Sequence, residues 1–182
     1  MELSTELAFF GGGCFWCLDA VFREIRGVHA ATCGYMGGLQ ENPDYRSVCT
    51  GQTGHAEVVR VEFDPALVNF GELLEVFFVI HDPTQLNRQG NDIGSQYRSV
   101  IFWASESQRD AALRVFDTLR AAGVAPLVTA LEPMVPSLVP FYPAEAEHQD
   151  YFRHHPQQGY CAAVVAPKLY KFREKFVNLL RK

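Results

Sequence analysis

The sequence predicts an α/β or α+β (two-layer) domain in which helices pack on a mixed sheet. Short apolar runs typical of strands alternate along the chain with segments whose apolar residues recur at helical spacing. The 182 residues are 48% hydrophobic and contain neither a repeat nor a linker-like segment, which fits one core of ordinary size. We therefore expect residues 1–182 to form a single domain.

The first half of the chain is expected to contain two strands and two helices. Glycine or proline stands where most of these elements stop, and Asn69 has the short polar side chain that caps a helix N-terminus. In chain order we predict a strand at 7–10, a helix from Cys14 to Gly27, a glycine-rich loop at 33–54, a strand at 56–63 and a helix from Asn69 to Asp82.

The second half begins with the same alternation and ends in a long irregular segment. Ser105 and Gln108 have the spacing of a capping box, and half of the ten prolines lie between Pro126 and Pro143, which favours an extended loop. In chain order we predict a strand at 97–103, a helix from Ser105 to Gly123, a strand at 127–131, a short helix at 144–154, a strand at 161–166 and a helix from Pro167 onward.

Composition and charge exclude several classes of function. A formal net charge of -5 leaves no basic surplus to neutralise phosphates, so we expect neither nucleic acid nor an anionic membrane as a partner. No apolar run approaches the roughly 18 residues of a membrane span, and residues 1–6 are acidic where a secretory signal is basic. In a protein expected in the cytoplasm, five cysteines favour working thiols over a disulfide framework.

Cys14 follows three glycines and stands where the first strand ends and the first helix begins. Unpaired backbone N–H groups and the positive end of the helix dipole stabilise an anion at such a position. A thiol pKa can fall there from about 8.5 to roughly 3.5–7.5, which predicts that Cys14 is a nucleophile. The glycines permit the sharp turn that leaves the sulfur uncovered.

Other interpretations of this cysteine remain open. Cys14 lies on the apolar stripe of its helix, where an inert buried thiol would pack. With Cys17 it has the spacing of a thioredoxin-like pair, so a disulfide oxidoreductase or thiol peroxidase is one alternative. A zinc-stabilised interaction module is another, because Cys14, Cys17, His29 and Cys33 follow the order of zinc ligands.

Glu57 begins the apolar face of its strand. The period of two places it on the same face as Val59 and Val61. Burial would raise its pKa by about two to three units, or roughly 3 to 4 kcal/mol in favour of the neutral form. Glu57 would then stay protonated near neutral pH and could act as a general acid. The alternative is a first-position side chain that points into solvent.

Five segments in one order resemble the A-type peptide methionine sulfoxide reductase family. They span nearly the whole chain and cover residues 13–16, 34–38, 53–57, 89–99 and 159–161. The resemblance implies a ferredoxin-like split sheet core and reduction of the S epimer of methionine sulfoxide, free or in oxidised proteins. It also implies thioredoxin as the reductant, and no metal or organic cofactor is expected.

The resemblance assigns a role to each matched residue. Cys14 would attack the sulfoxide sulfur and become a sulfenic acid, while Glu57 would supply a proton to the departing oxygen. Hydroxyl groups would stabilise the charge on that oxygen, and an aromatic wall would receive the substrate methyl group. These further residues are Tyr35, Tyr97 and Asp92 around the oxygen, and Phe15 and Trp16 in the wall.

A second thiol must then close a disulfide with Cys14. Cys161 matches the position that commonly resolves the sulfenic acid in this family, but residues 162–168 replace the familiar glycine-rich tail after it. Cys17 is the alternative, although a helix would strain a bridge between residues three apart. Cys33 and Cys49 are expected to pack as small apolar residues.

Overall fold

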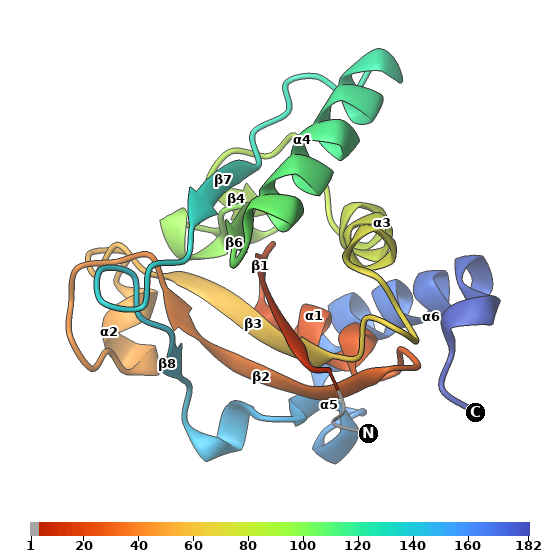
Figure 1. The fold of residues 1–182 in the computed structure, drawn as a ribbon. Helices are drawn as coiled ribbons and strands as arrows, with labels where there is room; N and C mark the ends of the chain where they lie inside the picture. The colour runs from red at the N-terminus through yellow and green to blue at the C-terminus, as the bar shows by residue number, and fades with distance from the viewer. Residues whose placement is uncertain (1–3) are drawn as a thin grey trace.

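The computed structural model describes residues 4–182, in which helices pack on one face of a six-stranded sheet (Figure 1). The order across the sheet is β7-β6-β1-β3-β2-β8. Neighbouring strands in the described residues pair antiparallel, except β6 and β7, which are parallel. The strands are β1 (Glu6–Gly11), β2 (Val28–Met36), β3 (Ala56–Phe63), β6 (Val100–Trp103), β7 (Ala130–Pro133) and β8 (Tyr142–Pro143).

The four central strands have ferredoxin-like connectivity. Along the chain, β1, α1 (Phe15–Phe22), β2, β3, α3 (Phe70–Ile80) and β6 follow one another. In space β3 lies between β1 and β2, which splits the first β-α-β unit. The predicted mixed α/β class is therefore confirmed, and so is the split core.

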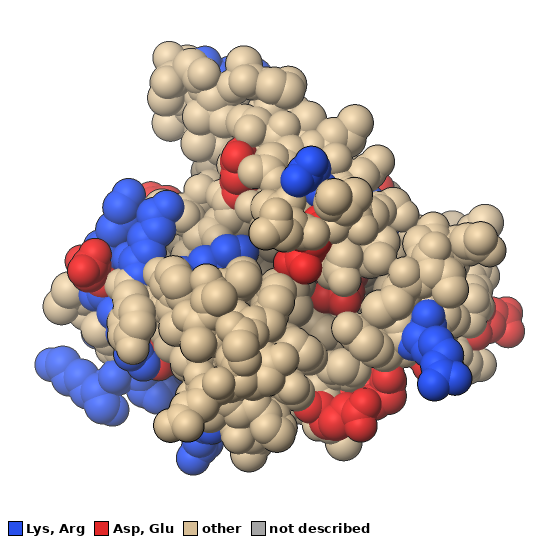
Figure 2. All heavy atoms as spheres, turned by 180° about the vertical axis from the view of Figure 1, so that it is seen from behind, with Lys and Arg blue, Asp and Glu red and all other residues tan. Residues whose placement is uncertain are grey.

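The remaining elements extend this core. The helices are α2 (Tyr45–Cys49), α4 (Glu106–Ala121), α5 (Tyr151–His154) and α6 (Ala166–Lys175), and a separate hairpin consists of β4 (Arg88–Gln89) and β5 (Asp92–Ile93). No helix between residues 4 and 182 is long and apolar enough to cross a membrane. Seen from behind, basic side chains gather toward the side of the C-terminus, although the net charge is negative (Figure 2).

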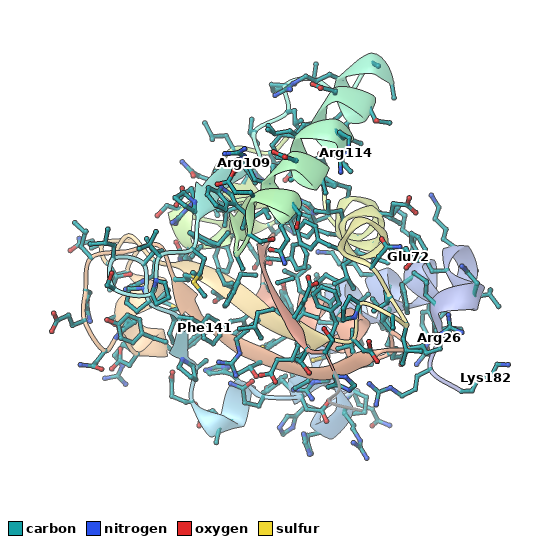
Figure 3. All side chains as sticks on the ribbon, viewed as in Figure 1. Arg26, Glu72, Arg109, Arg114, Phe141 and Lys182 are labelled. Atoms are coloured by element: carbon teal, nitrogen blue, oxygen red, sulfur yellow. The ribbon has the colours of Figure 1, made fainter. Side chains whose placement is uncertain are left out.

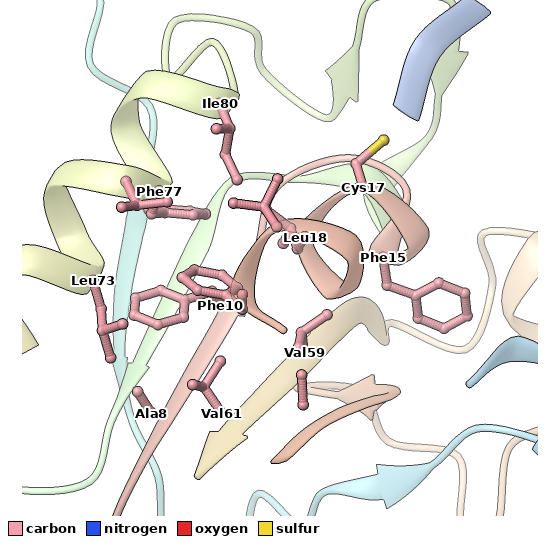
Figure 4. Close-up of a cluster of buried hydrophobic side chains, with 14 of the residues drawn as sticks. Ala8, Phe10, Phe15, Cys17, Leu18, Val59, Val61, Leu73, Phe77 and Ile80 are labelled. Carbon is pink, nitrogen blue, oxygen red and sulfur yellow. The ribbon is translucent and has the colours of Figure 1, made fainter. Parts of the chain in front are cut away.

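The main hydrophobic core lies between the sheet and helices α1, α3 and α6. Phe10 of β1 stands at its centre, with its ring centroid 5.1 Å from those of Phe22 and Phe77 (Figure 4). In a smaller core on the opposite face, the ring of Phe9 lies 5.8 Å, centroid to centroid, from that of Phe141, which belongs to the segment before β8. Phe141 is labelled in Figure 3. Burial of both faces fixes the strand register, because a slip by one residue would turn every side chain to the wrong face.

Helix caps follow the predicted chemistry. Asn69 and Glu72 form a reciprocal capping box at the start of α3. Ser105 caps α4 by accepting a bond from the backbone N–H of Gln108, but only half of the predicted box forms. The Gln108 side chain accepts from the backbone N–H of Ala104 instead of that of Ser105.

Two predicted segments are wrong. Much of the expected loop at 33–54 is ordered as the end of β2 and as α2, because long-range pairing with β3 overrides the glycines of the local sequence. The expected strand at 161–166 is a π-helical turn, Cys161–Val165, that leads into α6. A short apolar run does not by itself distinguish a strand from a buried helical turn.

Smaller differences affect the element ends. The first helix stops at Phe22 instead of Gly27, and the helix expected at 144–154 is a 3₁₀ turn, Ala146–His148, followed by the single turn of α5. Strand β7 begins at Ala130, three residues after the start of the strand predicted at 127–131. Residues 1–3 of the predicted domain lie outside the described residues.

Candidate active site

The turn between β1 and α1 presents Cys14 at the helix N-terminus, as predicted. Gly13 has a φ of +84°, a conformation that favours glycine, and a Cβ there would lie 2.9 Å from the side chain of Gln89. The Gly13 N–H donates to the Tyr97 carbonyl at 3.2 Å. This hydrogen bond fixes the backbone of the turn, and Cys14, the next residue, is the first residue of the candidate site.

The first N–H groups of α1 serve two different side chains. The backbone N–H of Trp16 bonds to the sulfur of Cys14 and lowers its pKa. The backbone N–H of Phe15 donates to Oε2 of Glu57 at 3.0 Å. The same helix end therefore places the thiol of Cys14 and the carboxyl of Glu57 beside each other.

Burial raises the pKa of the Cys14 thiol well above its usual range. Its contact with the Cys17 thiol and the charge of Glu57 add to this effect, and they outweigh the Trp16 N–H. The predicted lowering of this pKa is therefore wrong, because Cys14 is only 8% exposed. The hydrogen bond between the two thiols lowers the pKa of Cys17.

Glu57 is buried on β3, with 1% of its surface exposed. Burial raises its pKa from 4.5 to about 8, against the opposing effect of the Phe15 N–H. The charge of Asp92 raises it further. The prediction of a protonated glutamate at neutral pH is supported, and the alternative of a side chain in solvent is wrong.

Tyr97 and Asp92 both interact electrostatically with Glu57. Tyr97 ends the 3₁₀ turn Ser95–Tyr97, and its pKa is raised first by burial and then by the charge of Glu57. Asp92 of β5 accepts a hydrogen bond of 2.5 Å from the hydroxyl of Tyr160. Burial first, and then the charges of Cys14 and Cys17, raise the pKa of Tyr160.

Tyr35 of β2 is directly opposite Glu57 in the strand pairing. Its hydroxyl donates to Oε1 of Glu145 at 3.0 Å, so in this state the Tyr35 hydroxyl already has a partner. Burial, followed by this bond, raises the pKa of Tyr35. The structure thus brings Tyr35 to the site, with its hydroxyl engaged.

Phe15 and Trp16 lead into a group of stacked aromatic rings. Phe15 is fully buried, and its ring centroid lies 5.8 Å from that of Tyr35. Trp16 stacks on Tyr151, with 3.8 Å between centroids, and meets the edge of Tyr160 at 5.9 Å. An aromatic wall of this kind accepts a methyl group and excludes water.

The remaining cysteines occupy different environments. Cys161 is fully buried in its π-helical turn, which contacts α1, and the charge of Cys17 raises its pKa after burial. Cys33 is buried and contacts the Phe15 carbonyl at 3.7 Å, as expected for a packed thiol. Cys49 is exposed, so the prediction that it packs as an apolar residue is wrong.

The four residues of the zinc interpretation do not converge. His29 is exposed on β2, whereas Cys14, Cys17 and Cys33 are buried. Within residues 4–182, the group with metal-ligand spacing is Glu145, Glu147 and His148.

A cavity of about 430 Å³ lies away from Cys14, and two of the arginines that line it, Arg23 and Arg173, are paired with carboxylates.

Sequence reasoning missed several residues of the site. Glu145 accepts a hydrogen bond from Tyr35, and His148 accepts one from Trp16. Tyr151 stacks on Trp16. Tyr160 lies in the matched segment 159–161, but its sequence setting does not indicate that its hydroxyl donates to Asp92. A local signal for them was weak, since they lie more than 60 positions from their partners.

This fold and this site define a class: an α+β oxidoreductase in which a buried thiol stands beside a protonated carboxyl. The chain belongs to the peptide methionine sulfoxide reductase family, whose model matches residues 6–180. It is 56% identical over 180 residues to the peptide methionine sulfoxide reductase MsrA of Ralstonia nicotianae, covering 98% of this chain and 94% of the relative.

Solved structures agree with this assignment. Methionine sulfoxide reductase A of Corynebacterium diphtheriae is 40% identical, with a TM-score of 0.76 over 87% of this chain and 78% of that one. Mxr1 of Saccharomyces cerevisiae in reduced form is 31% identical, with a TM-score of 0.80 over 88% and 91%. Mxr1 in complex with Trx2 shares the fold, at 23% identity and a TM-score of 0.57 over 83% and 87%.

Proposed function

We propose that this chain reduces the S epimer of methionine sulfoxide, free or in proteins, and so repairs proteins after oxidative damage. One observation supports the mechanism: the N-terminus of α1 holds the Cys14 thiol beside a buried acid, Glu57, whose pKa is about 8. Both groups are neutral at pH 7, so the site begins the reaction with one proton on the sulfur and one on the carboxyl.

The protons and electrons balance within this pair. As the Cys14 sulfur attacks the sulfoxide sulfur, Glu57 gives its proton to the sulfoxide oxygen, and the resulting carboxylate takes the proton from the Cys14 thiol. The oxygen then moves to Cys14, which becomes a sulfenic acid, and methionine leaves. Cys14 loses two electrons, the substrate sulfur gains them, and Glu57 returns to its protonated state.

The high pKa of Cys14 gives Glu57 two roles in the proposed reaction. A thiol that is not ionised needs a base at the moment of attack, and Glu57 becomes that base once it has protonated the oxygen. The Trp16 N–H stabilises the negative charge that develops on the sulfur. Nucleophile activation is therefore coupled to substrate protonation.

Hydroxyl groups complete the oxygen site, by which we mean the side chains proposed to surround the sulfoxide oxygen. Tyr97, whose pKa is raised by the charge of Glu57, is proposed to donate to the sulfoxide oxygen, with Asp92 in the same polar shell. Tyr35 is proposed to join it after a change of partner from Glu145. Each such donor acts where charge develops in the transition state.

A preference for one epimer is expected from three directions at one sulfur, and the family resemblance identifies that epimer as S. The aromatic wall of Phe15 and Trp16 receives the methyl group, and Glu57 with Tyr97 receives the oxygen. The remaining substituent must then point out of the site, toward the rest of the substrate. For only one epimer does this arrangement leave the sulfur facing Cys14.

We propose that Cys161 resolves the sulfenic acid: its thiol condenses with Cys14 to form a disulfide and water, and thioredoxin reduces this disulfide. The complex of Mxr1 with Trx2 supports a thioredoxin partner. Cys17 is the alternative resolving thiol, because its thiol contacts that of Cys14 and its charge raises the pKa of Cys161. A π-helical turn is less regular than an α-helix, which favours local rearrangement around Cys161.

The test is a reductase assay with separated epimers and a thioredoxin system. The S epimer should give methionine at a steady rate, and the R epimer should give none. Cys49→Ser serves as a matched control, because this exposed cysteine lies outside the mechanism. Equal turnover of both epimers, or turnover of peroxide but not of sulfoxide, would exclude the proposed activity.

A further inference from the structure

His148 lies beneath the indole of Trp16 and is 4% exposed. Its Nδ1 accepts a hydrogen bond of 3.2 Å from the indole N–H of Trp16. Its ring also lies 5.4 Å from that of Phe15 and 4.4 Å from that of Tyr45, centroid to centroid. His148 thus packs against both residues of the aromatic wall.

The Trp16 contact fixes the tautomer of His148. An indole N–H can only donate, so Nδ1 must be unprotonated and the single proton of the neutral ring stands on Nε2. Nε2 is buried and has no hydrogen-bond partner within residues 4–182, and it lies 3.8 Å from Glu145 and 3.9 Å from Glu147. The Nε2–H therefore points toward carboxylates.

This tautomer argues against a metal ion at these three residues. A cation bound to Nε2 would move the ring proton to Nδ1, where it would face the N–H of Trp16. Two donors would then meet in a buried place, at the cost of the bond that orients the indole. The geometry favours an organising role instead.

Glu145 connects the same turn to the other half of the site. Its Oε1 accepts from the Tyr35 hydroxyl at 3.0 Å, and its Oε2 accepts from the Tyr45 backbone N–H at 3.1 Å. One 3₁₀ turn and the residue before it therefore hold both Trp16 and Tyr35. These are a wall residue and an oxygen-site residue of the proposed reaction.

We propose that His148 is a positioning residue for sulfoxide reduction, whose neutral ring holds the Trp16 indole in the orientation that receives the substrate methyl group. This inference rests on the proposed function. It assigns to the turn at 145–148 the role of holding Trp16 of the aromatic wall and Tyr35 in fixed positions relative to each other.

The proposal includes a dependence on pH. The titratable groups that face His148 are Glu145 and Glu147 on its own turn and Tyr45 on α2. Burial lowers the pKa of His148 below its usual 6.5, so the ring is neutral at pH 7, although both glutamates oppose this shift. As the pH falls through that pKa, Nδ1 gains a proton and the bond to Trp16 is lost.

A pair of variants separates this role from general packing. His148→Phe keeps a ring but removes the acceptor, and His148→Asn keeps an acceptor near the position of Nδ1. In single turnovers with the S epimer, His148→Phe should raise the half-saturating concentration about tenfold and change the maximal rate less than about threefold. His148→Asn should restore most of the loss. Equal defects in both variants, or none in His148→Phe, would overturn the proposal.

A second measurement uses the wild-type protein and needs no activity. Nitrogen-15 NMR of the histidine rings should show His148 as the Nε2–H tautomer, and the Trp16 indole N–H signal should shift only as the pH falls below about 6.5. Trp103 supplies an internal reference. An Nδ1–H tautomer, or a Trp16 signal that ignores acid, would contradict the proposal even if the reductase activity is confirmed.

Discussion

Replacing Glu57 with glutamine should make the protein more stable and the reaction slower. The buried carboxyl has a pKa of about 8, against 4.5 for an ordinary glutamate. Unfolding lets this group ionise in water, so ionisation stabilises the unfolded state at pH values above 4.5 and begins to stabilise the folded state only near pH 8. Stability due to Glu57 is thus greatest below pH 4.5 and is lost as the pH rises through 8.

The size of the effect follows from the two pKa values. At 1.36 kcal/mol per pKa unit, Glu57 lowers the free energy of unfolding by about 1 kcal/mol at pH 5, by about 3 kcal/mol at pH 7 and by about 5 kcal/mol at pH 9. Glutamine cannot ionise, and its carbonyl can still accept the N–H of Phe15. Glu57→Gln should therefore gain little stability at pH 5 and several kcal/mol at pH 9.

Urea unfolding at pH 5, 7 and 9 measures this gain, and single-turnover methionine release measures the loss of activity. Without its transferable proton the reductase step should slow by about 100-fold to 10,000-fold. Glu62→Gln, on the same strand but 31% exposed in its side chain, is the matched control and should show neither effect. A stability difference that stays constant across the three pH values would refute the buried acid.

Further predictions address the other groups. Cys14→Ser should release no methionine even in one turnover, because a hydroxyl lacks the nucleophilicity of sulfur; a normal yield from the folded variant would exclude Cys14 as nucleophile. Cys161→Ser should keep one turnover but lose thioredoxin-driven cycling, and peptide mapping of oxidised wild type should find a Cys14–Cys161 disulfide; a Cys14–Cys17 disulfide would transfer the resolving role to Cys17. The wild-type single-turnover rate should fall as the pH rises through about 8, where Glu57 loses its proton; a rate that keeps rising to pH 10 would indicate that ionisation of Cys14 limits the reaction instead.

Local sequence determined the elements that carry their own signals. The strand at 56–63 has clear alternation and a proline stop, and the helix after Asn69 has a reciprocal cap, so both were predicted correctly. Gly34 within β2, and the glycines that follow it, conceal a strand whose partner, β3, lies about 25 residues away. Pairing over such a distance leaves no trace in a short window.

The site shows the same division. Glu57 could be placed from the alternation of one strand, and Cys14 from the boundary between a strand and a helix. The pKa of Cys14 could not, because it depends on burial by neighbours from several elements. Likewise, the contact between Trp16 and His148 joins residues 132 positions apart, and only the folded chain brings them together.

The central claim is that the sulfoxide oxygen passes to Cys14. A protein with Cys17→Ser and Cys161→Ser cannot form the proposed disulfides, so its oxidised state should persist. One turnover with an S epimer labelled with heavy oxygen, followed by intact and peptide mass spectrometry, tests the transfer directly. We expect one methionine released and one labelled oxygen on the peptide that contains Cys14. Methionine release with an unmodified Cys14, or with the label only in water at the earliest times, would contradict the account.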